Sequence, residues 1–182
     1  MALRAKKPEV KKPSRAKVFL FGEYKVGKTT WALQWPMVYC LDSERGMDHY
    51  RQKIVDSQGV ILQTTDIDEL IDEIRALATE THQHKTIVID PITTLESDLV
   101  EKAEKLFGAG DMRIWGMRDR ILKRLVNLLY KLDMNVIVTA HSKVDYGPNM
   151  VKLGTTFDAW KRWPYVFDLV LEIVKQGEKR MA

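Results

Sequence analysis

A glycine-framed segment ending in a lysine and a threonine is the first sign of chemistry in this sequence. Residues 22–29, Gly-Glu-Tyr-Lys-Val-Gly-Lys-Thr, match the pattern G-x-x-x-x-G-K-[ST]. The glycines of this pattern let successive backbone N–H groups face a phosphate, and its lysine contacts the β- and γ-phosphates while its threonine binds magnesium. The segment therefore predicts a nucleoside triphosphate site. The expected nucleotide-binding residues are Gly22, Glu23, Tyr24, Lys25, Val26, Gly27, Lys28, Thr29 and Thr30.

Three polar residues that follow apolar runs are candidates to complete this site. Asp90 ends the run 86–90, where a carboxylate would hold magnesium beside Thr29; capping of the next helix is the alternative. Glu44 follows the run 37–41 and is the candidate for orienting the attacking water. Asp42 is its competitor, and a charged loop without chemistry is the alternative. His141 follows the run 135–140 and would face the γ-phosphate, unless it is merely structural.

These residues need a scaffold in which strand ends meet, and the apolar pattern provides one. Strands are expected at 18–21, 37–41, 60–62, 86–90, 135–140 and 167–174, and helices at 28–35, 66–79, 92–107 and 114–132. Strands that alternate with helices form right-handed crossovers. The prediction is an α/β fold with a mostly parallel central sheet flanked by helices, in a single domain over residues 17–182. Ligands bind at the carboxyl edge of such sheets.

The composition excludes several classes of protein. The chain has 182 residues and one cysteine, so one domain without a disulfide framework is expected, in a reducing compartment. No apolar run approaches the length needed to span a bilayer, which predicts a cytoplasmic protein without membrane contact. Residues 1–17 hold seven basic residues and one acid. Residues 1–16 are therefore expected to form a disordered basic tail, either simply solvated or in contact with phosphate backbones.

Taken together, the segments 41–44, 87–95 and 136–141 and the glycine-framed loop resemble the RecA-like P-loop ATPase core, over about residues 17–175. The resemblance implies an ATPase that uses ATP and Mg2+, with Glu44 and Lys28 as catalytic residues and His141 as the γ-phosphate sensor. The runs 26–31 and 140–143 are similar to those of compact phage ATPases with single-strand annealing or recombination roles. A phage-encoded protein acting in the host cytoplasm is the corresponding expectation.

In that family two loops line the path of single-stranded DNA, and here they correspond to residues 107–116 and 143–156. Both contain glycine and turn formers, so mobile loops are expected, although Asp111 and Asp145 count against a phosphate groove. The family also implies a homo-oligomer, a filament or a ring, DNA-stimulated hydrolysis and a single-strand binding protein as a further partner. The candidate DNA-binding residues are Arg113, Trp115, Lys143 and Lys152.

The C-terminus departs from the family pattern. Many relatives carry a lysine or arginine for the neighbouring subunit's site on a strand beyond the sixth. Here residues 176–182 suggest a hairpin that begins without returning, so either the chain is truncated or Lys179 and Arg180 are what is left of that strand.

Two other functions fit the same residues. One is an ATP-driven switch or loader that acts on protein partners. The other is a DNA-binding module that retains a nucleotide site for structure and hydrolyses ATP weakly.

Overall fold

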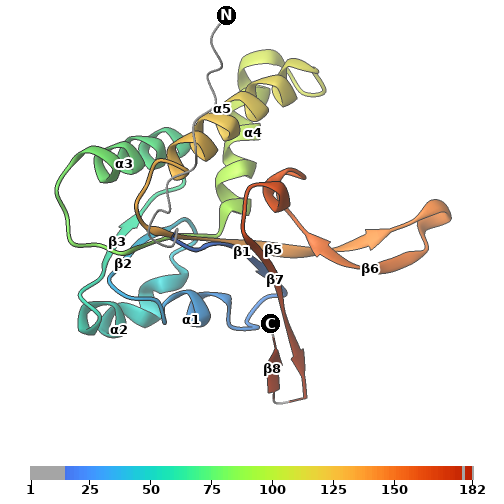
Figure 1. Cartoon of the computed structure of the whole chain (residues 1–182). Coiled ribbons are helices and arrows are strands. Elements are labelled where there is room, and N and C mark those ends of the chain that lie inside the picture. The colour runs from blue at the N-terminus through green and yellow to red at the C-terminus, as the bar shows by residue number, and fades with distance from the viewer. Residues whose placement is uncertain (1–14, 178, 182) are drawn as a thin grey trace, which may run out of the picture.

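The strands form one twisted sheet at the centre of the protein (Figure 1). The computed structural model describes residues 15–177 and 179–181, so the predicted tail at 1–16 lies almost wholly outside the described residues. The strands in the described part are β1 (Lys17–Gly22), β2 (Val38–Asp42), β3 (Val60–Gln63), β4 (Thr86–Asp90), β5 (Asn135–Tyr146), β6 (Lys152–Phe157), β7 (Leu169–Gln176) and β8 (Lys179–Met181).

The order of strands is β3-β2-β4-β5-β1-β7-β8, with β6 paired to β5 alone. The pairs along the path from β3 to β7 are parallel, and the pairs β5–β6 and β7–β8 are antiparallel hairpins. Parallel strands all point the same way, so the ends of β1, β2, β4 and β5 meet at one edge. The predicted α/β class with a mostly parallel sheet is confirmed.

Helices cover both faces of the sheet. They are α1 (Lys28–Ala32), α2 (Arg51–Asp56), α3 (Ile67–Thr79), α4 (Ile92–Phe107) and α5 (Arg113–Leu129), with short 3-10 turns η1 (Gly46–Tyr50), η2 (Pro148–Met150) and η3 (Trp163–Tyr165). Helices α3, α4 and α5 lie on one face, and α1 and α2 on the other (Figure 1). Ile87 and Ile89 of β4 pack with the first group and Val88 with the second, as expected for a strand buried on both faces.

Several predicted segments differ from the structure. The first predicted DNA loop, 107–116, lies outside helices only between Phe107 and Arg113, because α5 begins at Arg113. The helix expected over 28–35 ends at Ala32; Pro36 disfavours helical backbone at the residue before it. The second predicted DNA loop, 143–156, is mostly a hairpin, because β5 continues to Tyr146 and β6 pairs back on it. The C-terminal hairpin does return, since Lys179–Met181 pairs with Val174–Gln176.

The β5–β6 hairpin projects from the body of the protein (Figure 1). It continues the central strand β5 beyond the carboxyl edge of the sheet, starting at His141 and Ser142. No described helix is both long enough and apolar enough to cross a membrane.

Candidate functional site

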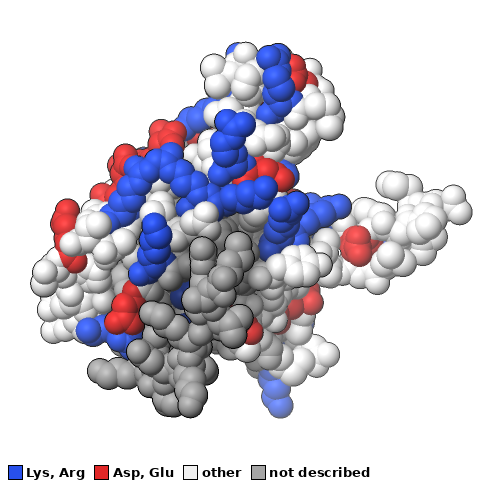
Figure 2. Space-filling model, turned by 45° about the horizontal axis from the view of Figure 1, so that its top comes forward, with Lys and Arg blue, Asp and Glu red and all other residues white. Residues whose placement is uncertain are grey.

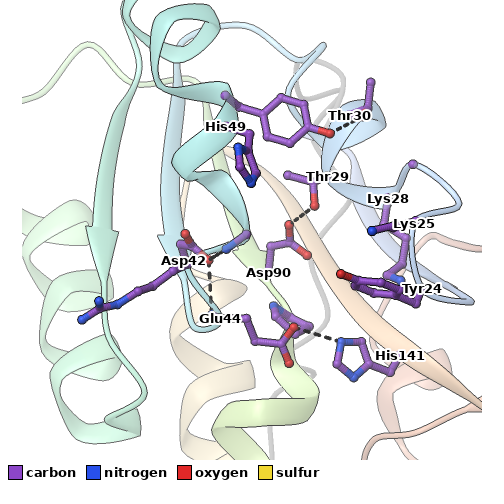
Figure 3. A pocket seen from close by; sticks show the side chains of 15 residues that line it. Tyr24, Lys25, Lys28, Thr29, Thr30, Asp42, Glu44, His49, Asp90 and His141 are labelled. Atoms are coloured by element: carbon purple, nitrogen blue, oxygen red, sulfur yellow. Dashed lines mark hydrogen bonds and ion pairs between the residues drawn. The ribbon is translucent and has the colours of Figure 1, made fainter.

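A pocket of about 630 Å³ lies at the carboxyl edge of the sheet. Its lining includes every predicted catalytic and metal-binding residue, drawn from four separate segments of the chain (Figure 3). These residues are Lys28, Thr29, Glu44, Asp90 and His141. The fold thus brings together side chains that lie up to 113 positions apart in the sequence.

The glycine-framed loop between β1 and α1 adopts a backbone that its two glycines permit. Gly27 has a φ of 107°, in the left-handed region that side chains disfavour. A Cβ on Gly22 would lie 2.5 Å from the carbonyl oxygen of Ile173. The pocket is lined by six of the nine predicted nucleotide-binding residues: Tyr24, Lys25, Gly27, Lys28, Thr29 and Thr30. Gly22, Glu23 and Val26 do not line it, and Val26 packs against Leu20 and Ile173 instead.

Lys28 places a buried ammonium group at the centre of this loop. Its Nζ donates to the carbonyl oxygens of Gly22 and Glu23, each at 2.9 Å. Burial lowers the pKa of Lys28, an effect that the nearby carboxylates of Asp90 and Glu44 oppose. No hydrogen bond to a carboxylate neutralises this ammonium among the described residues, so an anionic ligand would find a charge already in place.

Asp90 is the buried carboxylate at the end of β4. Its Oδ2 accepts a hydrogen bond from Thr29 Oγ1 at 2.5 Å, and its Oδ1 accepts one from Thr139 Oγ1. Burial raises the pKa of Asp90, while the two threonine hydroxyls and Lys28 oppose the shift. Thr139 was not predicted, because a threonine inside a strand looks like any other β-branched residue.

The Thr29–Asp90 pair fits a magnesium ion. Both side chains offer oxygen, the ligand that Mg2+ prefers, and they already touch. Among the described residues no group of three or more His, Cys, Asp or Glu could hold a metal. Mg2+ needs only one or two protein ligands when phosphate oxygens and water molecules fill its other coordination positions.

Glu44 and Asp42 have different environments, although they are two residues apart. Glu44 Oε1 accepts a hydrogen bond from Thr94 Oγ1, and Oε2 lies 3.2 Å from His141 Nε2 (Figure 3). Asp42 is only 2% exposed and accepts the backbone N–H groups of Glu44, Gly46 and Met47 at 3.1–3.2 Å. Asp42 therefore builds the turn that presents Glu44 to the pocket.

His141 is connected to the base of the β5–β6 hairpin through Thr93. The backbone N–H of His141 donates to Thr93 Oγ1 at 3.0 Å, and that hydroxyl donates to the carbonyl of Asp158 at 2.8 Å. The N–H of Asp158 in turn donates to the carbonyl of His141 at 2.7 Å. The pocket and the point where the hairpin leaves the sheet thus share one hydrogen-bond network.

One wall of the pocket was not predicted from the sequence. His49 and Tyr50 line the pocket from η1, and Arg45 lines it from the residue before η1. The hydroxyl of Tyr50 lies 2.8 Å from Thr30 Oγ1. The segment 46–56 carries few apolar residues, so its periodicity gave no sign of the two helical turns that it forms. The proximity of Glu44 in sequence was the only available signal.

The four candidate DNA-binding residues do not lie in one place in the structure. Trp115 and Lys143 line a second pocket of about 400 Å³ between α4, α5 and the hairpin, whereas Arg113 and Lys152 lie outside it. Two of the three cations have carboxylate partners. Arg113 Nη2 lies 2.8 Å from Asp111 Oδ2, and Lys143 Nζ lies 2.8 Å from Asp158 Oδ1.

Comparisons with known proteins agree with this architecture. A family profile described as an AAA domain matches residues 14–182. The crystal structure of the RadB recombinase matches with a TM-score of 0.60 and 21% sequence identity, covering 91% of this chain and 78% of that one. A search of curated proteins finds no match. The predicted RecA-like P-loop core is confirmed by the family and by the fold.

Proposed function

Since the chain belongs to the AAA domain family and has a RecA-like P-loop ATPase core, we propose that it hydrolyses ATP with Mg2+ and acts on single-stranded DNA in recombination or strand annealing. The observation that carries the proposal is the convergence of Lys28, the Thr29–Asp90 pair and the Glu44–His141 pair in one pocket. The recombinase named in the structural comparison supports the DNA target. The proposal includes a phage origin, a cytoplasmic location, assembly into a filament or ring, and a single-strand binding protein as a further partner.

Five residues of the pocket have a role in this reaction. Lys28 neutralises the β- and γ-phosphates, while Thr29 and Asp90 hold Mg2+, which when bound offsets phosphate charge. Glu44 accepts a proton from the attacking water. The water oxygen forms a bond to the γ-phosphorus while the bond between the γ-phosphorus and the β–γ bridging oxygen breaks. The electron pair of the broken bond stays on the bridging oxygen, which leaves as part of ADP. His141 contacts Glu44 and the network at the hairpin, so it is the proposed sensor of the γ-phosphate.

The experiment that tests the proposal measures phosphate release by wild type and Lys28→Ala, with and without single-stranded DNA. Loss of the ammonium leaves the triphosphate under-neutralised, so turnover in Lys28→Ala is expected to fall by roughly 10²–10³-fold and nucleotide affinity with it. Circular dichroism should show an unchanged fold. Wild-type turnover in Lys28→Ala contradicts the nucleotide site, and a wild type that releases no phosphate supports the weakly active DNA-binding module.

A switch or loader acting on a protein partner is the second candidate function. It is favoured by apolar side chains exposed on the β5–β6 hairpin, among them Tyr146, Met150 and Leu153. Such side chains suit an apolar protein surface better than a phosphate backbone. Phosphate release that responds to no DNA, together with absent DNA binding, favours this second candidate.

A further inference from the structure

The outer face of α5 carries a row of exposed cations. Arg120, Lys123, Arg124 and Lys131 follow helical spacing along α5 and the turn after it, and all are exposed. The opposite face of the helix is buried in the core through residues such as Leu122 and Leu125. Figure 2 shows Lys and Arg side chains gathered over this part of the protein.

Two further cations, Lys161 and Arg162, stand just before η3, and both are exposed. A hydrogen bond of 2.9 Å from the hydroxyl of Tyr130 to the carbonyl of Val166 fastens the end of α5 to the end of η3. The six cations are called the α5 band below: Arg120, Lys123, Arg124, Lys131, Lys161 and Arg162.

The α5 band differs from the predicted DNA loops in how its charges are compensated. Among the residues at 15–177 and 179–181, none of the band cations forms an ion pair, whereas Arg113 and Lys143 of the loops each do. The nearest acids of α5 and its following turn, Asp119 and Asp133, are engaged by Arg118 and Arg15. Because no carboxylate of the described residues pairs with these cations, their positive electrostatic potential is not cancelled. An anion can also bind to them without first breaking an ion pair.

The spacing and the neighbours of the band favour a nucleic acid strand as that anion. Residues three or four apart on a helix lie about 5–6 Å from each other, so the band presents repeated charges rather than one anion site. Tyr130 and Tyr165 are 51% and 88% exposed; in the chain Tyr130 directly precedes Lys131, and Tyr165 closely follows Arg162. Cations beside aromatic faces are the combination that binds single strands, through phosphates and stacked bases together.

We propose that the α5 band is the surface that binds the phosphate backbone of single-stranded DNA, with Tyr130 and Tyr165 offering stacking faces. This inference rests on the proposed action on single-stranded DNA, and it moves the main electrostatic contact from the two loops to the outer face of α5. The β5–β6 hairpin, which starts next to His141 of the nucleotide pocket, then contributes further contacts, while the α5 band supplies most of the affinity.

The test compares three double variants with wild type, using a fluorescent oligothymidylate titrated over a range of salt concentrations. The band variant is Arg120→Glu with Lys123→Glu, and the loop variant is Arg113→Glu with Lys143→Glu. The control, Lys53→Glu with Lys175→Glu, reverses two exposed cations on other elements, neither of which forms an ion pair within the described part of the chain, so it changes net charge equally. Thermal melting of each variant verifies that it is folded.

The band variant is expected to bind at least ~10-fold more weakly at low salt, with the slope of log K against log salt shallower by about 1.4, or 0.7 for each lost phosphate contact. The loop variant should lose less, and the control should bind like wild type. A band variant that binds like wild type, or a control that loses as much, overturns the α5 band while leaving DNA action intact. A wild type that binds no oligothymidylate at low salt overturns the proposed DNA action itself. A band variant that changes only the sedimentation of the protein shows a protein interface and overturns the proposal.

Discussion

Three charged side chains of the nucleotide pocket are buried, whereas those of the α5 band are exposed to solvent. In the pocket, Lys28, Asp42 and Asp90 are buried, and each makes hydrogen bonds to defined partners. The cations of the α5 band are exposed, and none of them forms an ion pair within the described residues. Buried charges in a low dielectric act through geometry, whereas exposed charges act through a field that salt screens. Substitutions in the pocket should therefore have large effects that depend little on salt.

The largest effect is expected from Glu44→Gln. The amide keeps the shape and can still contact Thr94, but it cannot take a proton from water. Phosphate release should fall by about 10²–10⁴-fold while ATP binding remains. Single-turnover kinetics and nucleotide titration separate the two quantities. Full activity in Glu44→Gln would mean that another group activates the water.

Asp42→Ala tests whether the second carboxylate is structural. Its removal leaves three backbone N–H groups of the 44–47 turn without their acceptor, inside a buried region. The free energy of unfolding should fall by about 3 kcal/mol, because charge-assisted hydrogen bonds are lost together with burial. Urea denaturation measures the change. If Asp42→Ala were as stable as wild type but did not hydrolyse ATP, Asp42 rather than Glu44 would be the residue that accepts the proton from water.

His141→Ala tests the connection between the pocket and the DNA. In wild type a non-hydrolysable ATP analogue should tighten DNA binding by about 5–150-fold, and DNA should tighten analogue binding by the same factor. The variant should bind each ligand alone and lose most of this factor. Paired titrations in both proteins measure it. The sensor assignment fails when the two proteins show equal coupling.

The smallest effect is expected from Glu96→Gln, which changes a buried carboxyl outside the nucleotide pocket. Glu96 Oε1 accepts from the backbone N–H of Trp160 and from Trp163 Nε1, and burial raises its pKa. A raised pKa means that the folded state binds the proton more tightly, so stability falls as pH rises from the unfolded value of about 4.3. Glutamine keeps the acceptor without the charge. Glu96→Gln should melt about 2–4 °C higher than wild type at pH 8 and equally near pH 4. A gain at pH 4 that equals the gain at pH 8 would contradict a charge effect.

Local pattern predicted much of the sheet and the pocket. The strand at 86–90 and the helix at 92–107 were predicted to the residue, since continuous apolar runs and helical periodicity are local signals. Glu44, Asp90 and His141 were found because each follows such a run. The segment 143–156 was predicted as a loop, because the hairpin that it forms depends on pairing across a Gly-Pro turn rather than on its own pattern.

The hydroxyls of Thr93, Thr94 and Thr139 could not be predicted. Threonine suits both a strand and the first turn of a helix, so composition gives no reason to assign it a partner. Their partners, Asp158, Glu44 and Asp90, lie between 49 and 65 positions away in the sequence. Only the folded chain brings these pairs together.

The position of β1 also determines when the protein can become active during synthesis. β1 pairs with β5 and β7, both of which come much later in the chain. Its first residue, Lys17, therefore has no partner in the sheet until Val136 of β5 has been synthesised. Strands β2, β3 and β4 pair among themselves and can assemble earlier. At 5–20 residues per second, the ribosome needs roughly 6–24 s to supply that partner. The glycine-framed loop is attached to β1, so a nascent chain should gain affinity for nucleotide only after β5 has been synthesised.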